Sequence, residues 1–198
     1  IGTNASSANL NEVVVIHKIG TNSFRLTSHN SHNGVYVTET PTVTSSGTVN
    51  PTSFVNTLSF YYVVGSYTGA LTAGTNTLNS QGGSDAFCIA FRRNPSFVVN
   101  NARSYGGTGN DIFNNIEENQ QVSYVIWLSG SFTGTFNGEY TSGSTFSHTS
   151  AGGKDAIVMQ VVVSGSSPTE AELRPIAAAD VLVLGGTGDD EVKNTSYS

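Results

Sequence analysis

The stretch YYVVGSYTGAL, residues 61–71, returns later in the chain as VIWLSGSFTGTF, residues 125–136. Both copies are rich in β-branched and aromatic residues and are bounded by Gly, Ser and Asn, which favours a strand over a helix. Inside them, GSYTG at 65–69 matches GSFTG at 130–134, a spacing of 65. The chain therefore repeats itself, and the repeated element is predicted to be a β-strand.

Two further motifs recur in the same order. GGSDAFCIAF (82–91) returns as GGKDAIVMQV (152–161), and GGTGND (106–111) returns as GGTGDD (185–190). Sliding the chain by 73 positions also places residues 12–16 on the DAFCI of the first of these motifs. The sequence thus predicts one continuous β domain of about two and a half units. The expected boundaries are a divergent first repeat at 1–60, a second at 61–124 and an incomplete third at 125–198.

Repeat units of this length predict the architecture. A four-stranded sheet buries its faces only against neighbouring sheets, and units that recur every 65 to 79 residues have the period of propeller blades with long loops. The expected fold class is all-β, with repeated four-stranded antiparallel blades in a propeller-like arrangement. Only SPTEAELRPIAAAD (167–180) has a helix-like pattern, and Pro175 limits it to one or two turns.

The ordered motifs also carry a family resemblance. GSFTGTF, TSAGGKDAIV and GGTGDD, with their partners GSYTGAL, NSQGGSDAFCIAF and GGTGND, resemble the bacterial beta-propeller repeat family often called SBBP. The resemblance covers roughly residues 61–198 and implies a propeller or propeller-like array. In the first copy, YVTETPTVTSSGTVNP (36–51) replaces the expected Gly-rich turn.

Two and a half units do not close a ring that typically needs at least four blades. We therefore expect either a piece of a longer chain or chains that associate through open β edges.

Composition excludes some partners. The net charge is −6, and no Lys/Arg cluster exists beyond Arg92-Arg93, so a nucleic-acid partner is not expected. No apolar run approaches 18 residues, so no membrane span is expected. The single Cys88 allows no internal disulfide, and its apolar neighbours predict a buried, inert thiol.

The Gly-rich motifs also fit a calcium template. GGTGNDIFN (106–114) and GGTGDDEVK (185–193) match the nine-residue calcium-roll pattern at every fixed position. Calcium needs six to eight oxygens, whereas these isolated copies offer Asp111 alone, or Asp189 with Asp190. We expect tight turns in which the aspartates cap their own loops, with calcium as the alternative and no resident cofactor.

Asp85 and Asp155, after Gly-Gly, are interpreted in the same way. We expect each to accept backbone hydrogen bonds of the preceding turn, with a cation or substrate site in a channel as the alternative. His29 and His32 could bind zinc but have no acidic or Cys partner nearby, which favours a solvated loop.

Aromatic residues recur in register and leave two roles open. Trp127, Tyr67 and Phe132 could stack on sugar rings if exposed, but their periodic placement in strands favours packing between sheets. The sequence contains no nucleophile elbow, HExxH, phosphate loop or dinucleotide fingerprint, so we expect no enzymatic activity.

These patterns predict a non-enzymatic, extracellular or cell-surface structural or adhesive β-repeat protein. We expect it to self-associate into a surface layer, an appendage or filament, or a virion component. The alternative is a carbohydrate-binding β-propeller module of a larger secreted protein, with a glycan as its partner.

Overall fold

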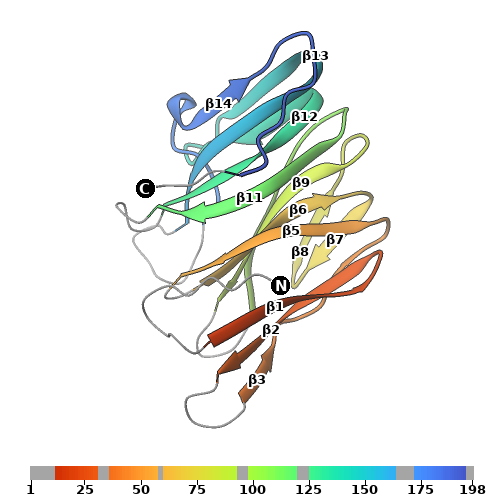
Figure 1. Ribbon diagram of the computed structural model, residues 1–198, viewed down its shortest axis with the longest axis vertical. Coiled ribbons are helices and arrows are strands. Elements are labelled where there is room, and N and C mark those ends of the chain that lie inside the picture. Colours follow the sequence, from red (N-terminus) through yellow and green to blue (C-terminus); the bar gives the residue numbers. More distant parts are fainter. Residues whose placement is uncertain are drawn as a thin grey trace.

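The fold is all-β and antiparallel, as the sequence predicts (Figure 1). The computed structural model describes residues 12–30, 36–57, 60–92, 98–119, 125–163 and 172–194. The strands are β1 (Glu12–Gly20), β2 (Ser23–Asn30), β3 (Tyr36–Glu39), β4 (Val43–Ser45), β5 (Val49–Asn56), β6 (Phe60–Tyr67), β7 (Ala70–Ala73), β8 (Asn76–Asn79), β9 (Asp85–Arg92), β10 (Val98–Tyr105), β11 (Asp111–Glu118), β12 (Val125–Glu139), β13 (Thr145–Val162) and β14 (Val181–Leu184).

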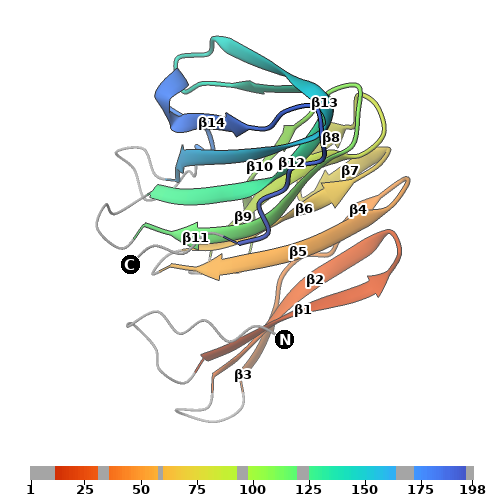
Figure 2. The ribbon, with the colours of Figure 1, turned by 45° about the horizontal axis from the view of Figure 1, so that its top comes forward.

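The strands form three sheets, here named A, B and C. Sheet A has the order β1-β2-β4-β7-β8, with β3 also paired to β2; sheet B is β10-β9-β6-β5, and sheet C is β11-β12-β13-β14. Figures 1 and 2 show them following one another along the long axis, from the N-terminal hairpin to the C-terminal sheet. Within the described ranges no sheet closes on itself.

Sheets B and C place the recurring motifs on matching strands. The GSYTG motif begins in β6 and ends two residues after it, and GSFTG lies within β12. The strands β9 and β13 contain Asp85 and Asp155, and β10 and β14 precede the GGTG loops. Each sheet also begins with a strand from the preceding predicted repeat, β5 or β11. The chain therefore crosses from one sheet to the next at the Gly-rich loop.

Sheet B is covered on both faces, which explains why β6 is buried along almost its entire length. Tyr61 and Val63 join an apolar cluster shared with sheet A, whereas Tyr62 and Val64 join a cluster shared with sheet C. This alternation follows from the two-residue period of a strand. At about 25 cal/mol per Å² of buried apolar surface, such clusters are the main stabilising contribution.

The first copy departs from sheets B and C. Residues 36–51, expected to replace a turn, supply β3, β4 and the start of β5. The β7–β8 hairpin pairs with β4 and so extends sheet A, while in sheet C the corresponding hairpin continues β12 and β13. In the described part of the helix-like stretch, residues 172–180, there is one 3-10 turn, Ala178–Asp180, whose Asp180 carboxylate accepts the N–H groups of Ile176 and Ala177.

Candidate functional site

Four aspartates accept hydrogen bonds from backbone four residues earlier. Asp111 Oδ2 accepts the N–H of Gly107 at 3.0 Å, and Asp190 Oδ2 accepts that of Gly186 at 3.1 Å. Asp85 and Asp155 do the same in the turns that precede β9 and β13. The donors there are Gln81 N–H, 3.2 Å from Asp85 Oδ2, and Ala151 N–H, 3.0 Å from Asp155 Oδ2. These contacts confirm that the aspartates cap their own loops.

Asp85 and Asp111 are both buried and both lie next to Gly106, where a Cβ would overlap the two carboxylates. Burial raises the pKa of Asp111 to about 7, opposed by the hydrogen bond from Gly107 and increased by the neighbouring Asp85. Burial likewise raises the pKa of Asp85, opposed by hydrogen bonds from Gln81 and Ser104. The pair therefore titrates closer to neutrality than free carboxyl groups do.

The residues considered for calcium are divided between two loops. Asp111 is fully buried, while Asp189 and Asp190 are exposed. Asp189 Oδ1 accepts the N–H of Lys154 at 2.9 Å, so this carboxylate also serves the backbone. Among the described residues no group of three or more His, Cys, Asp or Glu side chains is arranged to hold a metal. His32 and the side chain of His29 lie outside the described residues.

Two loops join one sheet to the next: 46–48 leads from sheet A to sheet B, and 106–110 leads from sheet B to sheet C. Residues 185–189, which follow β14, match 106–110 in sequence, and we call all three joint loops. The second follows β10 and hydrogen-bonds to β12 of sheet C. Asn110 N–H donates to Thr133 Oγ1 at 2.7 Å, and Thr133 N–H donates back to Asn110 O at 3.1 Å. The first joint loop repeats the pattern, with Thr48 N–H to Thr68 Oγ1 at 2.9 Å and Thr68 N–H to Thr48 O at 2.9 Å.

These contacts give the recurring Thr-Gly pair a physical role. The threonine hydroxyl accepts a backbone N–H of the joint loop that enters its sheet. The glycine that follows has φ of +75° at Gly69 and +68° at Gly134, a conformation that other residues adopt only at a cost. The threonine of the motif therefore binds the preceding joint loop, and at Gly134 the β12–β13 pairing shifts register while β12 continues to Glu139.

Among the described residues, the third joint loop, 185–189, has no such neighbour. A Cβ at Gly107 would overlap Thr135 Oγ1, and a Cβ at Gly109 would overlap the carbonyl oxygen of Thr133. At the matching positions, Gly186 and Gly188, no atom of the described chain lies within 4 Å of a Cβ. The same glycines are thus packed in one loop and open in the other.

A polar cleft lies between β10 and the extended β12–β13 hairpin. Its volume is about 410 Å³, and residues from both sheets B and C line it, among them Gln81, Asp85, Arg103, Asn137 and Phe146. It combines amide, carboxylate and guanidinium groups with an aromatic ring. That set of groups is typical of sites for polar small molecules.

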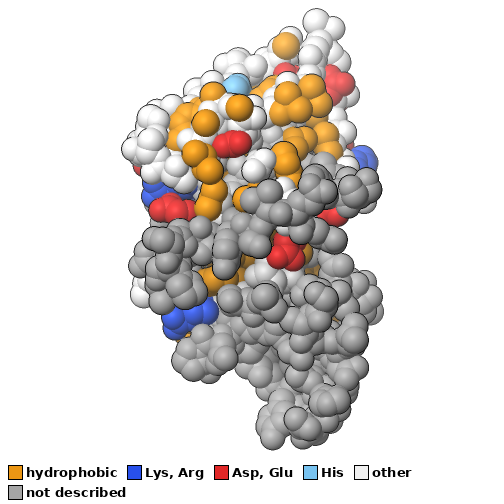
Figure 3. Space-filling view, turned by 90° about the vertical axis from the view of Figure 1, so that its left-hand side faces the viewer, with side chains coloured by type: hydrophobic (Ala, Val, Ile, Leu, Met, Phe, Trp, Pro, Cys, Tyr) orange, Lys and Arg blue, Asp and Glu red, His pale blue; other side chains and the backbone are white. Residues whose placement is uncertain are grey.

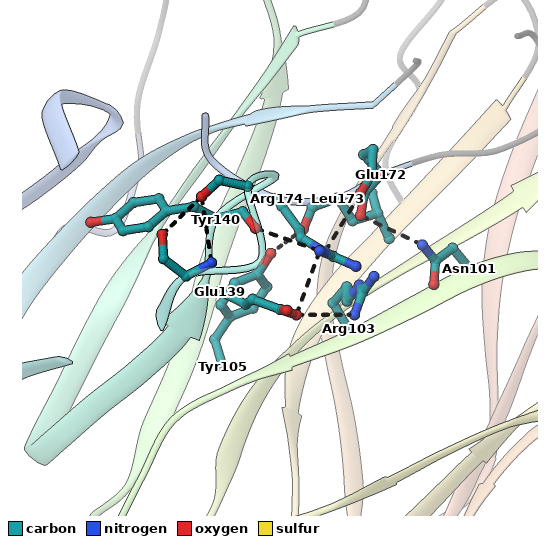
Figure 4. A network of polar contacts seen from close by, with 10 residues as sticks. Asn101, Arg103, Tyr105, Glu139, Tyr140, Glu172, Leu173 and Arg174 are labelled. Atoms are coloured by element: carbon teal, nitrogen blue, oxygen red, sulfur yellow. Dashed lines mark hydrogen bonds and ion pairs between the residues drawn. The ribbon is translucent and has the colours of Figure 1, made fainter. Parts of the chain in front are cut away.

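Ion pairs hold one wall of this cleft (Figure 4). Glu139 Oε2 lies 3.7 Å from Arg103 Nη1 and 3.6 Å from Arg174 Nη1. Residues 172–174 form a strap that contains Arg174. Its Leu173 is fully buried with φ of +57°, and the Leu173 carbonyl accepts a hydrogen bond from the Tyr105 hydroxyl. Residues 172–174 thus fasten sheet B to sheet C, a connection that the sequence motifs did not indicate.

The aromatic residues considered for sugar stacking fall into two groups. Tyr67 and Phe132 are 1% and 0% exposed, so neither ring offers a face to a ligand. Trp127 is half-buried, and its indole N–H has no hydrogen-bond partner in the described part of the chain. Cys88 is fully buried as predicted, and burial raises the pKa of its thiol.

No protein-family model, curated protein or solved structure matches the chain. Functional inference therefore rests on the contacts of its own residues. Within the described ranges, no helix has the length and apolar character needed to cross a membrane.

Proposed function

We propose that the chain is a non-enzymatic structural or adhesive β-repeat protein of the cell exterior that self-associates by stacking sheets. A surface layer, an appendage or a virion component would be built in this way. One observation carries the proposal: the strand β14 of sheet C holds Leu182 and Leu184 half exposed, at 51% and 50%.

The position of Leu184 explains why its exposure matters. Leu184 and Tyr105 each stand directly before a GGTG motif, at the ends of matching strands. Tyr105 is 2% exposed, and its ring lies parallel to that of Phe136 with centroids 6.2 Å apart. Tyr105 of sheet B is therefore covered by sheet C, whereas Leu184, at the matching position of sheet C, is open to solvent.

The neighbouring surface has the same character. Leu182 pairs with Val158, and Leu184 pairs with Ala156, so these side chains share the face of sheet C that is directed away from sheet B. Figure 3, viewed from the side on which β14 lies in Figure 1, has hydrophobic side chains gathered over the upper part of the molecule. A propeller-like continuation of the stack would cover this face.

Sedimentation velocity over a wide range of protein concentrations tests the proposal. Wild-type protein is expected to form larger species as concentration rises, and Leu182→Asp and Leu184→Asp are expected to reduce them because a charge opposes apolar burial. Ile19→Asp is the matched control, since Ile19 is 54% exposed on the β1–β2 hairpin, in sheet A. Wild-type protein that stays monomeric throughout would contradict self-association.

The cleft favours a second candidate, a carbohydrate-binding module of a larger secreted protein. Its amide and guanidinium groups beside Phe146 can bind sugar hydroxyls and one face of a sugar ring. Glycan-array binding that is lost in Gln81→Ala, while the melting temperature stays unchanged, would support this function. Absence of binding to any glycan would count against it.

A further inference from the structure

We propose that joint loop 185–189 is a docking site for a β-strand that carries the Ser-aromatic-Thr-Gly sequence of β6 and β12. The inference goes beyond the proposed self-association, because β6 and β12 are paired on both sides in the folded chain and Thr68 and Thr133 already bind joint loops 46–48 and 106–110. The occupant is therefore a motif strand with a free edge, supplied by a partner β-repeat unit, and not β6 or β12 of a second folded copy. At joint loop 106–110 such a strand is bound, because Thr133 of β12 accepts the N–H of Asn110.

The half of the site that belongs to sheet C is already formed. Asp189 Oδ1 accepts the N–H of Lys154 at 2.9 Å, and Asp190 N–H donates to Lys154 O at 2.6 Å. In sheet B, Asn110 Oδ1 accepts the N–H of Ser84 at 3.2 Å, and Asp111 N–H donates to Ser84 O at 2.7 Å. Joint loop 185–189 is therefore held against its own sheet as joint loop 106–110 is.

The other half of the site is open. At joint loop 106–110, Thr133 and Thr135 of β12 occupy the space beside Gly107 and Gly109 so closely that no Cβ would fit. Beside Gly188 that space holds no described atom, and Gly188 is exposed to solvent. The vacant volume has the position of the threonine-bearing strand.

A separate contact sets the path of the next sheet. In sheet B, Thr52 Oγ1 donates to the carbonyl of Phe113 at 2.6 Å, which positions β11 across β5. In sheet C, Asn114 Nδ2 donates to the carbonyl of Val192 at 3.2 Å. Val192 follows GGTGDD at the same distance as Phe113 follows GGTGND. Residues 190–192 thus begin to cross sheet C as β11 crosses sheet B.

The pairing of β11 with β12 in sheet C shows which strand would lie next to residues 190–192. The strand β11 pairs with β12, and Asp111 stands opposite Phe132 of the Ser-Phe-Thr-Gly motif. By the same register, Asp190 would stand opposite the aromatic residue of an incoming motif strand. Backbone pairing would supply affinity, and the threonine hydroxyl would supply selectivity.

The test measures binding of a fluorescent peptide with the sequence of residues 128–137, LSGSFTGTFN, to the full chain by fluorescence anisotropy. Saturable binding is expected. A Gly188→Val protein is expected to bind roughly tenfold or more weakly, because its side chain fills the space the threonine needs. Gly20→Val, at an exposed glycine in sheet A, is the matched control and should bind normally.

A second peptide tests the hydroxyl. Replacing Thr133 by Val in the peptide keeps the side-chain shape and removes the acceptor, so weaker binding is expected. No binding of the unmodified peptide, or equal binding by wild type and Gly188→Val with unchanged melting temperatures, would overturn the inference.

The outcomes separate this inference from the proposed function. Peptide binding by a chain that sediments as a monomer keeps the docking site and removes self-association. Concentration-dependent association that Gly188→Val leaves intact, together with no peptide binding, keeps self-association and removes the docking site.

Discussion

Joint loops 106–110 and 185–189 read GGTGN and GGTGD, yet their surroundings differ completely. The first is clamped between its own sheet and the Thr-Gly strand of the next, while the second touches its own sheet alone among the described residues. The conformation of both loops is therefore specified locally, by their glycines and by a capping aspartate. Gly107 and Gly109 must lack side chains because the neighbouring strand β12 leaves no room for a Cβ. At Gly186 and Gly188 no described atom imposes that requirement.

The largest expected effect comes from the residues just before the two loops. Tyr105→Ala removes a buried ring that packs on Phe113 and Phe136, so it should lower the free energy of unfolding by about 3–5 kcal/mol. Leu184→Ala, at the matching exposed position, should change it by about 0.5 kcal/mol or less. Urea denaturation measures both. Equal losses would mean that Leu184 is packed as Tyr105 is.

A smaller effect is expected from the glycines themselves. Gly109→Ala would push a methyl group into the Thr133 carbonyl and should cost about 1–3 kcal/mol, or about 2–4 °C in melting temperature per kcal/mol. Gly188→Ala meets open space and should leave the melting temperature nearly unchanged. If the first substitution were harmless, close approach would not explain the glycines.

The third effect is a pH dependence that arises at joint loop 106–110. The pKa of Asp111 is raised from 3.8 to about 7, so the folded state keeps a proton that the unfolded state has lost. The stability this proton confers is present below about pH 4 and is lost as pH rises through about 7. The raised pKa of Asp85 acts in the same direction.

Thermal melts at pH 5 and pH 8 check this. The protein should melt at a lower temperature at pH 8, and Asp111→Asn should reduce the difference. Asp190→Asn, at the exposed matching position, should preserve it. A difference that is unaffected by Asp111→Asn would assign the titration to other groups.

Much of the fold could be predicted from sequence because the repeated motifs are local. Short runs of β-branched, aromatic and other apolar residues in β6 and β9, with the Gly-Gly-x-Asp turns, predict strands and their ends. Capping by Asp85 and Asp155 follows from the preference of aspartate for turns. The strand order of sheets B and C then follows the order of the motifs.

The rest depends on contacts that no short pattern carries. Sheet A differs because residues 36–51, which replace the Gly-rich turn of the other copies, form strands. One of these strands, β4, pairs with β7 of the β7–β8 hairpin. The strap at 172–174 was missed because its role rests on Leu173 and Arg174 meeting β10 and β12 from far away in the sequence. The Thr-Gly pair recurs at 68–69 and 133–134, and this recurrence was the sequence signal for the contact with the joint loops. Only the hydrogen bonds of Thr68 and Thr133 identify these loops as the partners.

The vacant joint lies on sheet C, and the N-terminal sheet A carries no copy of GGTG. Contacts made through it join unlike surfaces, so they are heterologous and cannot be satisfied by a twofold dimer. Assembly through this loop would therefore have a direction, and a partner unit with a free motif strand at one end and an open GGTG loop at the other would extend it as a closed ring or as a polar fibre.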